Sequence, residues 1–112
     1  MQCGSGIAMK DPLHPTEGIR LLLERKSISE DQQSAVYGGA IYGVESLYLS
    51  VVTLAMDGNA EIVEESENTD PAALSALLKL SKSTARAAKR KHSEKLPPWP
   101  PRVLRWRGPG RG

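Results

Sequence analysis

Apolar residues recur along much of the chain at the three- and four-residue spacing that places side chains on one face of an α-helix. The first such stretch is short. Thr16 can cap a helix whose buried stripe is Ile19, Leu22 and Leu23, and which ends near Lys26. The pattern therefore predicts a short N-terminal helix after an unstructured segment 1–15.

A second and longer helix is predicted by the polar residues that follow. Ser27 with Glu30 and Ser29 with Gln32 form two overlapping capping boxes, which mark a helix start. The helix would run to about Met56, because Gly58 suits a left-handed C-terminal cap. Its apolar residues occupy one half of a helical wheel, as in an amphipathic core helix. They are Val36, Ala40, Gly43, Val44, Leu47, Tyr48, Val51, Leu54 and Ala55.

Two alternatives exist for this stretch. Residues 47–55 are rich in β-branched side chains, and Asp57-Gly58-Asn59 could form a turn, so a β-hairpin over 47–64 in an α+β fold is one. The other is a membrane span over 35–56, which contains Gly39-x-x-x-Gly43. Glu45 argues against the span, since a central carboxylate is costly in a bilayer. We read the glycines as packing sites.

A third helix has the strongest start signal in the chain. Asp70 can cap the free amides and Pro71 is preset for the first helical position. The helix is expected to reach about Lys95 and to bury Leu74, Leu77 and Leu78. The prediction is therefore an all-α, three-helix domain at 16–95. A disordered N-terminus (1–15) precedes it, and an extended Pro/Arg/Gly-rich basic tail (96–112) follows.

Charge divides the chain into two unlike parts. Residues 1–78 have a net charge of −8, whereas residues 79–112 have ten more basic than acidic side chains. Such asymmetry indicates an acidic body with a basic arm for an anionic partner. The alternative is that the arm folds back onto the acidic segment 61–70. The arm supplies the candidate nucleic-acid-binding residues, which are Lys79, Lys82, Arg86, Lys89, Arg90, Lys91, Arg102, Arg105, Trp106, Arg107 and Arg111.

Within the tail, arginines flank Trp106, which combines phosphate contacts with a surface on which a base can stack. The same residues could instead pack Trp99 and Trp106 onto the body as a strap. Pro97-x-x-Pro100-x-Arg102 also has the spacing of polyproline ligands of SH3-type domains, although the bare pattern is weak.

Catalytic and metal-binding chemistry has no support in the sequence. A lone Cys3 forms no internal disulfide, and His14 and His92 lack the neighbours of a zinc site. The acidic run 61–70 lacks calcium-loop spacing, and no nucleotide-binding or nucleophile motif occurs. The first fifteen residues lack the apolar run of an export signal. We therefore expect no enzyme activity, no metal, no cofactor and a cytoplasmic location.

The residues taken together predict a small non-enzymatic protein that engages nucleic acid without strong sequence preference. The alternative is a protein-interaction or regulatory module whose basic arm contacts an acidic protein surface. Because 112 residues without Phe give a thin core, we also expect a homodimer formed through the apolar half of residues 36–55.

Overall fold

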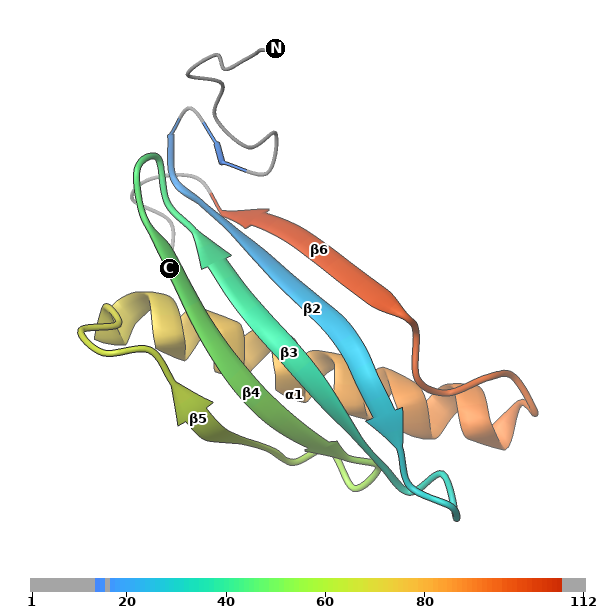
Figure 1. Cartoon of the computed structure of the whole chain (residues 1–112). Helices are drawn as coiled ribbons and strands as arrows, with labels where there is room; N and C mark the ends of the chain where they lie inside the picture. The colour runs from blue at the N-terminus through green and yellow to red at the C-terminus, as the bar shows by residue number, and fades with distance from the viewer. Residues whose placement is uncertain (1–13, 16, 108–112) are drawn as a thin grey trace, which may run out of the picture.

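The computed structural model describes residues 14, 15 and 17–107 and forms a five-stranded antiparallel sheet with one long helix (Figure 1). The sheet has the strand order β5-β4-β3-β2-β6. Its elements in chain order are β2 (Ile19–Ile28), β3 (Ser34–Tyr42), β4 (Leu47–Ala55), β5 (Ala60–Glu65), the helix α1 (Pro71–Ser93) and β6 (Arg102–Arg107).

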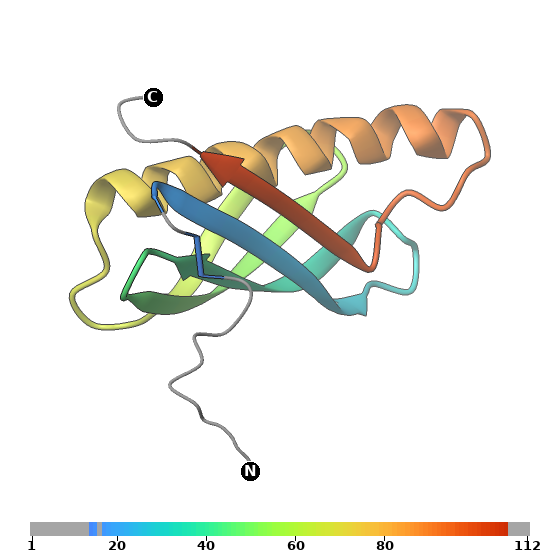
Figure 2. The same cartoon turned by 90° about the horizontal axis from the view of Figure 1, so that it is seen from above.

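The molecule has two layers. The helix α1 crosses one face of the twisted sheet and packs on β2 to β5 (Figure 2). We call this side the helix face and the other side, which faces the viewer in Figure 1, the open face. The core lies on the helix face, where Leu23, Tyr37, Val52 and Leu54 of the sheet meet Leu77 of the helix.

The all-α prediction is wrong, and the α+β alternative with a hairpin at 47–64 is closer to the structure. Strands replace both predicted N-terminal helices. In β4 the buried side chains are Ser50, Val52 and Leu54, which follow the two-residue period of a strand. Almost every residue from 35 to 44 is apolar or glycine, so a helical wheel and a strand account for these positions equally well. The helical wheel consequently suggested the helical repeat of about 3.6 residues, whereas the structure has the two-residue repeat of a strand.

The capping signals at 27–32 have a different role from the one predicted. The Ser29 hydroxyl donates to Asp31 Oδ1, and the same carboxylate oxygen accepts from the Gln33 amide. Gln32 has a φ of 62°, in the left-handed region. These residues form the turn between β2 and β3, because an Asp or Ser side chain satisfies turn amides as readily as helix amides.

The third predicted helix is present. Asp70 Oδ1 accepts from the Ala72 amide at 3.2 Å, and Pro71 occupies the first turn. The helix ends at Ser93 with Glu94 as its C-cap, close to the expected end near Lys95.

The C-terminal segment is part of the fold instead of an extended tail. The chain returns from α1 through a proline-rich connection in which Trp99 is 1 % exposed. Its indole donates to the Gln32 carbonyl, and the Tyr37 hydroxyl donates to the Pro100 carbonyl. Residues 102–107 then add β6 to the free side of β2. The strap alternative therefore describes Trp99 correctly.

Candidate nucleic-acid interface

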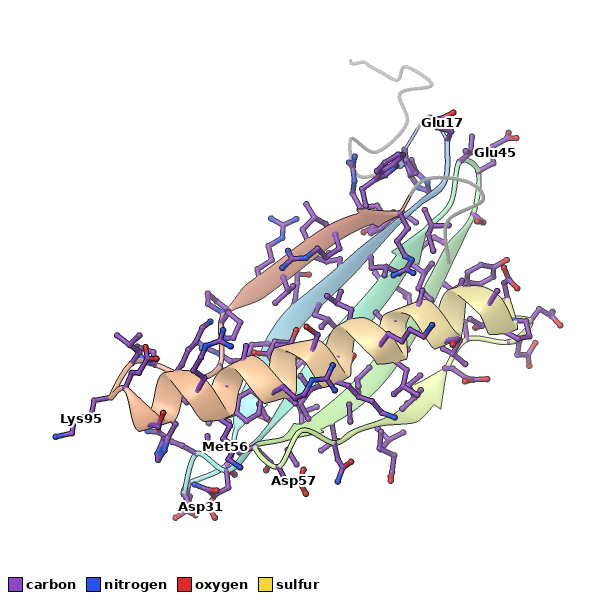
Figure 3. All side chains as sticks on the ribbon, turned by 180° about the vertical axis from the view of Figure 1, so that it is seen from behind. Glu17, Asp31, Glu45, Met56, Asp57 and Lys95 are labelled. Carbon is purple, nitrogen blue, oxygen red and sulfur yellow. The ribbon has the colours of Figure 1, made fainter. Side chains whose placement is uncertain are left out.

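The outer surface of α1 carries most of the predicted binding residues. Seven buried residues line the side of the helix that faces the sheet, with Leu77 and Ala85 fully enclosed. At 100° per residue, five cations lie on the opposite side. We call these five the basic ridge, and they are Lys79, Lys82, Arg86, Lys89 and Arg90. Figure 3 looks onto the helix side of the molecule, with α1 in front of the sheet.

The sequence of α1 leaves the ridge without local counter-charges. The 23 residues from Pro71 to Ser93 include no Asp or Glu. The Arg86 side chain lies close to Gly58 of the β4–β5 turn, with its Cγ 3.1 Å from the position that a Cβ on Gly58 would occupy. Lys91 lies outside the ridge, since its direction on the wheel is toward the sheet and its side chain is half-buried.

The predicted binding residues of the C-terminal segment are divided between the two faces of the sheet. In β6, Arg105 pairs with Leu21 and Arg107 with Ile19, so both arginines point to the helix face. Arg102 and Trp106 alternate with them and point to the open face. Arg111 lies outside the described residues. The structure thus groups the ridge residues and separates Arg102 and Trp106 from them.

Trp106 lies at the edge of the open face and is 50 % exposed. Its indole nitrogen donates to the Glu17 carbonyl at 3.0 Å, which fixes the ring against the segment that enters β2. Half of the Trp106 surface and part of the neighbouring Leu104 remain exposed. A base could stack there, but it would lie on the opposite side of the sheet from the basic ridge.

The acidic segment and the basic strand are at opposite edges of the sheet. The residues Glu61, Glu64 and Glu65 belong to β5, and the arginines of β6 are four strands away. The β6 part of the arm is therefore kept away from the acidic segment by the strand order, whereas the α1 part packs on β5. The sheet is negative along one edge and positive along the other.

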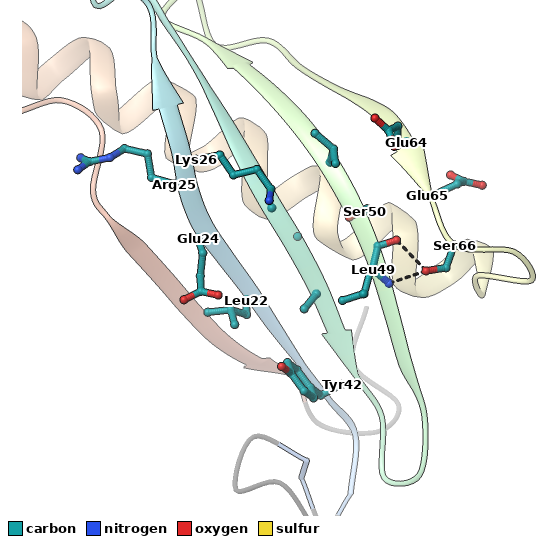
Figure 4. A pocket seen from close by; sticks show the side chains of 14 residues that line it. Leu22, Glu24, Arg25, Lys26, Tyr42, Leu49, Ser50, Glu64, Glu65 and Ser66 are labelled. Atoms are coloured by element: carbon teal, nitrogen blue, oxygen red, sulfur yellow. Dashed lines mark hydrogen bonds between the residues drawn. The ribbon is translucent and has the colours of Figure 1, made fainter.

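The open face holds a shallow groove that the sequence analysis missed (Figure 4). Leu22, Ala40 and Leu49 line it side by side on β2, β3 and β4, and Tyr42, Lys26 and Glu64 also line it. The groove has a volume of about 750 Å³. No clear signal for it exists in the sequence, because the apolar run at 35–44 suits a helix and a strand equally well.

Tyr42 is positioned by the segment that precedes β2. The His14 ring meets the Tyr42 ring edge-on, with centroids 5.1 Å apart. His14 Nδ1 lies 2.8 Å from the Gly43 carbonyl oxygen. This histidine therefore has a packing contact at the β3–β4 turn in the structure.

Neither a metal-ligand cluster nor a membrane-crossing helix occurs in the part of the chain that the structure describes. Across residues 14, 15 and 17–107, no cluster of three His, Cys, Asp or Glu side chains is arranged to hold a metal ion. No described helix combines the length and apolar character needed to cross a bilayer. No protein-family model, curated protein or solved structure matches the chain.

Proposed function

We propose that this protein is a non-enzymatic nucleic-acid-binding protein that contacts phosphates through the basic ridge of α1, without strong sequence preference. The observation that supports the proposal best is the ridge itself. Five Lys and Arg side chains share the outer side of one helix that contains no carboxylate. A cytoplasmic location is consistent with this proposal.

The geometry suits a repeating anion. Lys79 and Arg90 are eleven residues apart, so the ridge extends about 16 Å along the helix axis at 1.5 Å per residue. Several successive phosphates fit within that length, and each Lys or Arg that neutralises one releases condensed counterions. The ridge carries no exposed aromatic side chain, so phosphate contacts would dominate and base identity would matter little.

A protein with an acidic surface is the alternative partner. The same five cations would serve it, and side-chain geometry alone does not distinguish a carboxylate cluster from a phosphate chain. Phosphates are favoured because the cations form a continuous band along one side of a rigid helix. A pull-down with and without nuclease separates the two partners.

The test is the salt dependence of binding, measured by fluorescence anisotropy with labelled single-stranded and duplex DNA and RNA. Five phosphate contacts give a log–log slope of about −3.5 to −4.5, so affinity falls steeply as salt rises. Replacing Arg86, Lys89 and Arg90 by Gln should remove up to about three contacts from the slope.

A second triple variant controls for net charge. Lys26, Lys95 and Arg102 lie outside the ridge, and replacing them by Gln removes the same charge. This variant should keep a slope close to that of the wild type. If both triple variants reduce the salt slope equally, the binding site is not specific to the ridge. No salt-sensitive binding to any nucleic acid at low ionic strength would end the proposal and favour a protein partner.

A further inference from the structure

The open face of the sheet is apolar to a degree that the fold does not explain. Of the seven large apolar side chains that are most exposed in the described chain, four point to this face. These four are Leu47, Leu49, Leu104 and Trp106. Leu49 is 55 % exposed in the middle of the groove, beside Ala40 of the neighbouring strand. A contiguous apolar patch on a sheet commonly marks a protein interface.

The size of the face fits that of a stable dimer. Five strands at about 4.8 Å spacing and six to ten residues in length present on the order of 600 Å². A standard interface buries about 800 Å² on each partner. Two sheets that pack face to face through this surface would therefore form an interface near the standard size.

The two ends of the open face carry opposite net charges. At the end made of β2 and β6, the face carries Arg20, Lys26 and Arg102 with one carboxylate, Glu24. At the β5 end it carries Glu61 and Glu64, which are opposite Thr53 and Val51. The middle strands present no charge on this face. One end of the face is thus positive by two charges and the other negative by two.

We propose that a second copy of this chain covers the open face, with the two-fold axis running roughly parallel to the strands. That axis exchanges the two ends of the sheet, so β5 of each copy lies over the β2–β6 end of its partner. An axis perpendicular to the strands, within the interface, would place Glu61 and Glu64 over their own copies. Like charges in contact select against that arrangement.

Edge pairing is the other way in which two sheets could join, and the charges oppose it. Two β5 edges would bring carboxylates together, and two β6 edges would bring arginines together. A register shift between Val51 and Val52 also interrupts the pairing of β5 with β4. Irregular and charged edges disfavour edge association. The proposed dimer leaves both α1 helices outside and does not depend on the proposed nucleic-acid site.

The first test is sedimentation equilibrium of the full chain from low to high micromolar concentration. The wild type should show a monomer–dimer equilibrium. Leu49→Asp should weaken dimerisation at least roughly tenfold, because it places charges in the centre of the interface. Leu96→Asp is the matched control, since Leu96 is 50 % exposed but lies in the α1–β6 connection, away from the open face. It should dimerise like the wild type.

Charge reversal tests the direction of the axis. A Glu61→Lys, Glu64→Lys variant and a Lys26→Glu, Arg102→Glu variant should each dimerise at least roughly threefold more weakly, and their combination should recover affinity. Circular dichroism checks that every variant is folded. If Leu49→Asp is unfolded, Leu104→Asp replaces it.

Three results would overturn the proposal. The first is a wild type that stays monomeric at high micromolar concentration, and the second is an equal effect of Leu49→Asp and Leu96→Asp on dimerisation. The third is the formation of oligomers larger than a dimer, which would indicate pairing of β5 with β6. If both charge-reversal variants dimerise more weakly and their combination does not recover affinity, the proposed direction of the two-fold axis is wrong. A monomer that still binds nucleic acid would leave the proposed function standing without the dimer.

Discussion

The indole nitrogen of Trp99 donates a 2.8 Å hydrogen bond to the carbonyl of Gln32, a residue 67 positions earlier in the chain. The bond ties the proline-rich connection after α1 to the turn between β2 and β3. Arg25 strengthens the same junction, because its side chain donates to the Trp99 carbonyl and its amide donates to the Pro101 carbonyl. The segment that brings β6 into the sheet is therefore anchored at its start.

Trp99 should consequently be among the most sensitive positions in the protein. Trp99→Ala is expected to lower the free energy of unfolding by about 3–5 kcal/mol, because it removes a large buried side chain. Trp99→Phe keeps most of the bulk and should cost less, with about 1 kcal/mol from the lost hydrogen bond. Urea unfolding followed by circular dichroism measures both. A Trp99→Ala protein as stable as the wild type would show that the connection does not anchor the fold.

Gly39 should tolerate no side chain, whereas Gly38 beside it should. A Cβ at Gly39 would lie 2.5 Å from Ser50 Oγ and 2.9 Å from Leu77 Cδ2, between the sheet and α1. Gly39→Ala is therefore expected to cost about 1–3 kcal/mol. Gly38→Ala is the matched control, since its Cβ would meet chiefly the flexible end of Lys26. Equal stabilities of the two variants in urea would contradict the close approach of helix and sheet.

Ser50 offers a second measurement at the same contact. Its hydroxyl is buried and has no hydrogen-bond partner among the residues that the structure describes. Ser50→Ala should be neutral or stabilising, because it removes an unsatisfied polar atom. In a double-mutant cycle it should also reduce the cost of Gly39→Ala, since one of the two clashes disappears. Strictly additive effects would show that the two residues do not meet.

Stability should decrease at high pH because of Tyr37. Burial raises the pKa of its hydroxyl to about 12, although Arg25 acts in the opposite direction. An unfolded tyrosine has a pKa of about 10, so the unfolded state loses the proton first as the pH rises. The stability that the protonated Tyr37 hydroxyl gives to the fold is fully present below about pH 10 and is lost progressively toward pH 12.

The Tyr37→Phe variant isolates this effect from the other groups that titrate in the same range. It lacks the hydrogen bond to the Pro100 carbonyl, so it should be less stable at neutral pH. Its free energy of unfolding should then fall less steeply than that of the wild type above about pH 10. Parallel curves for the two proteins would mean that Tyr37 is not protected in the fold.

Trp106→Ala distinguishes the ridge from a stacking surface. Because Trp106 lies on the open face, we expect the variant to bind single-stranded nucleic acid with nearly wild-type affinity and an unchanged salt slope. This expectation replaces the loss of about 1–3 kcal/mol that stacking on an exposed tail would imply. Anisotropy titrations at low protein concentration measure the difference. A loss of that size would place bases on the open face instead.

The sequence by itself determined the features that depend on nearest neighbours or on composition. The helix α1 is one, because Asp70, Pro71 and the leucines that follow act within a few residues of each other. The separation of an acidic from a basic part is another, since net charge does not depend on folding. The turn at Asp57-Gly58 could also be predicted from the sequence, as part of the hairpin alternative.

Only the tertiary structure decided the rest. The apolar run at 35–44 is compatible with both a helix and a strand, and the choice depends on β2 and β4 as pairing partners on either side. Arg105 and Arg107 came to point to the helix face, and Trp106 between them to the open face, when residues 102–107 paired with β2, more than 70 residues earlier in the chain. Hydrogen bonds between distant strands are not encoded in any local window of sequence. For that reason the sequence revealed the basic residues, and the fold decided which of them share a surface.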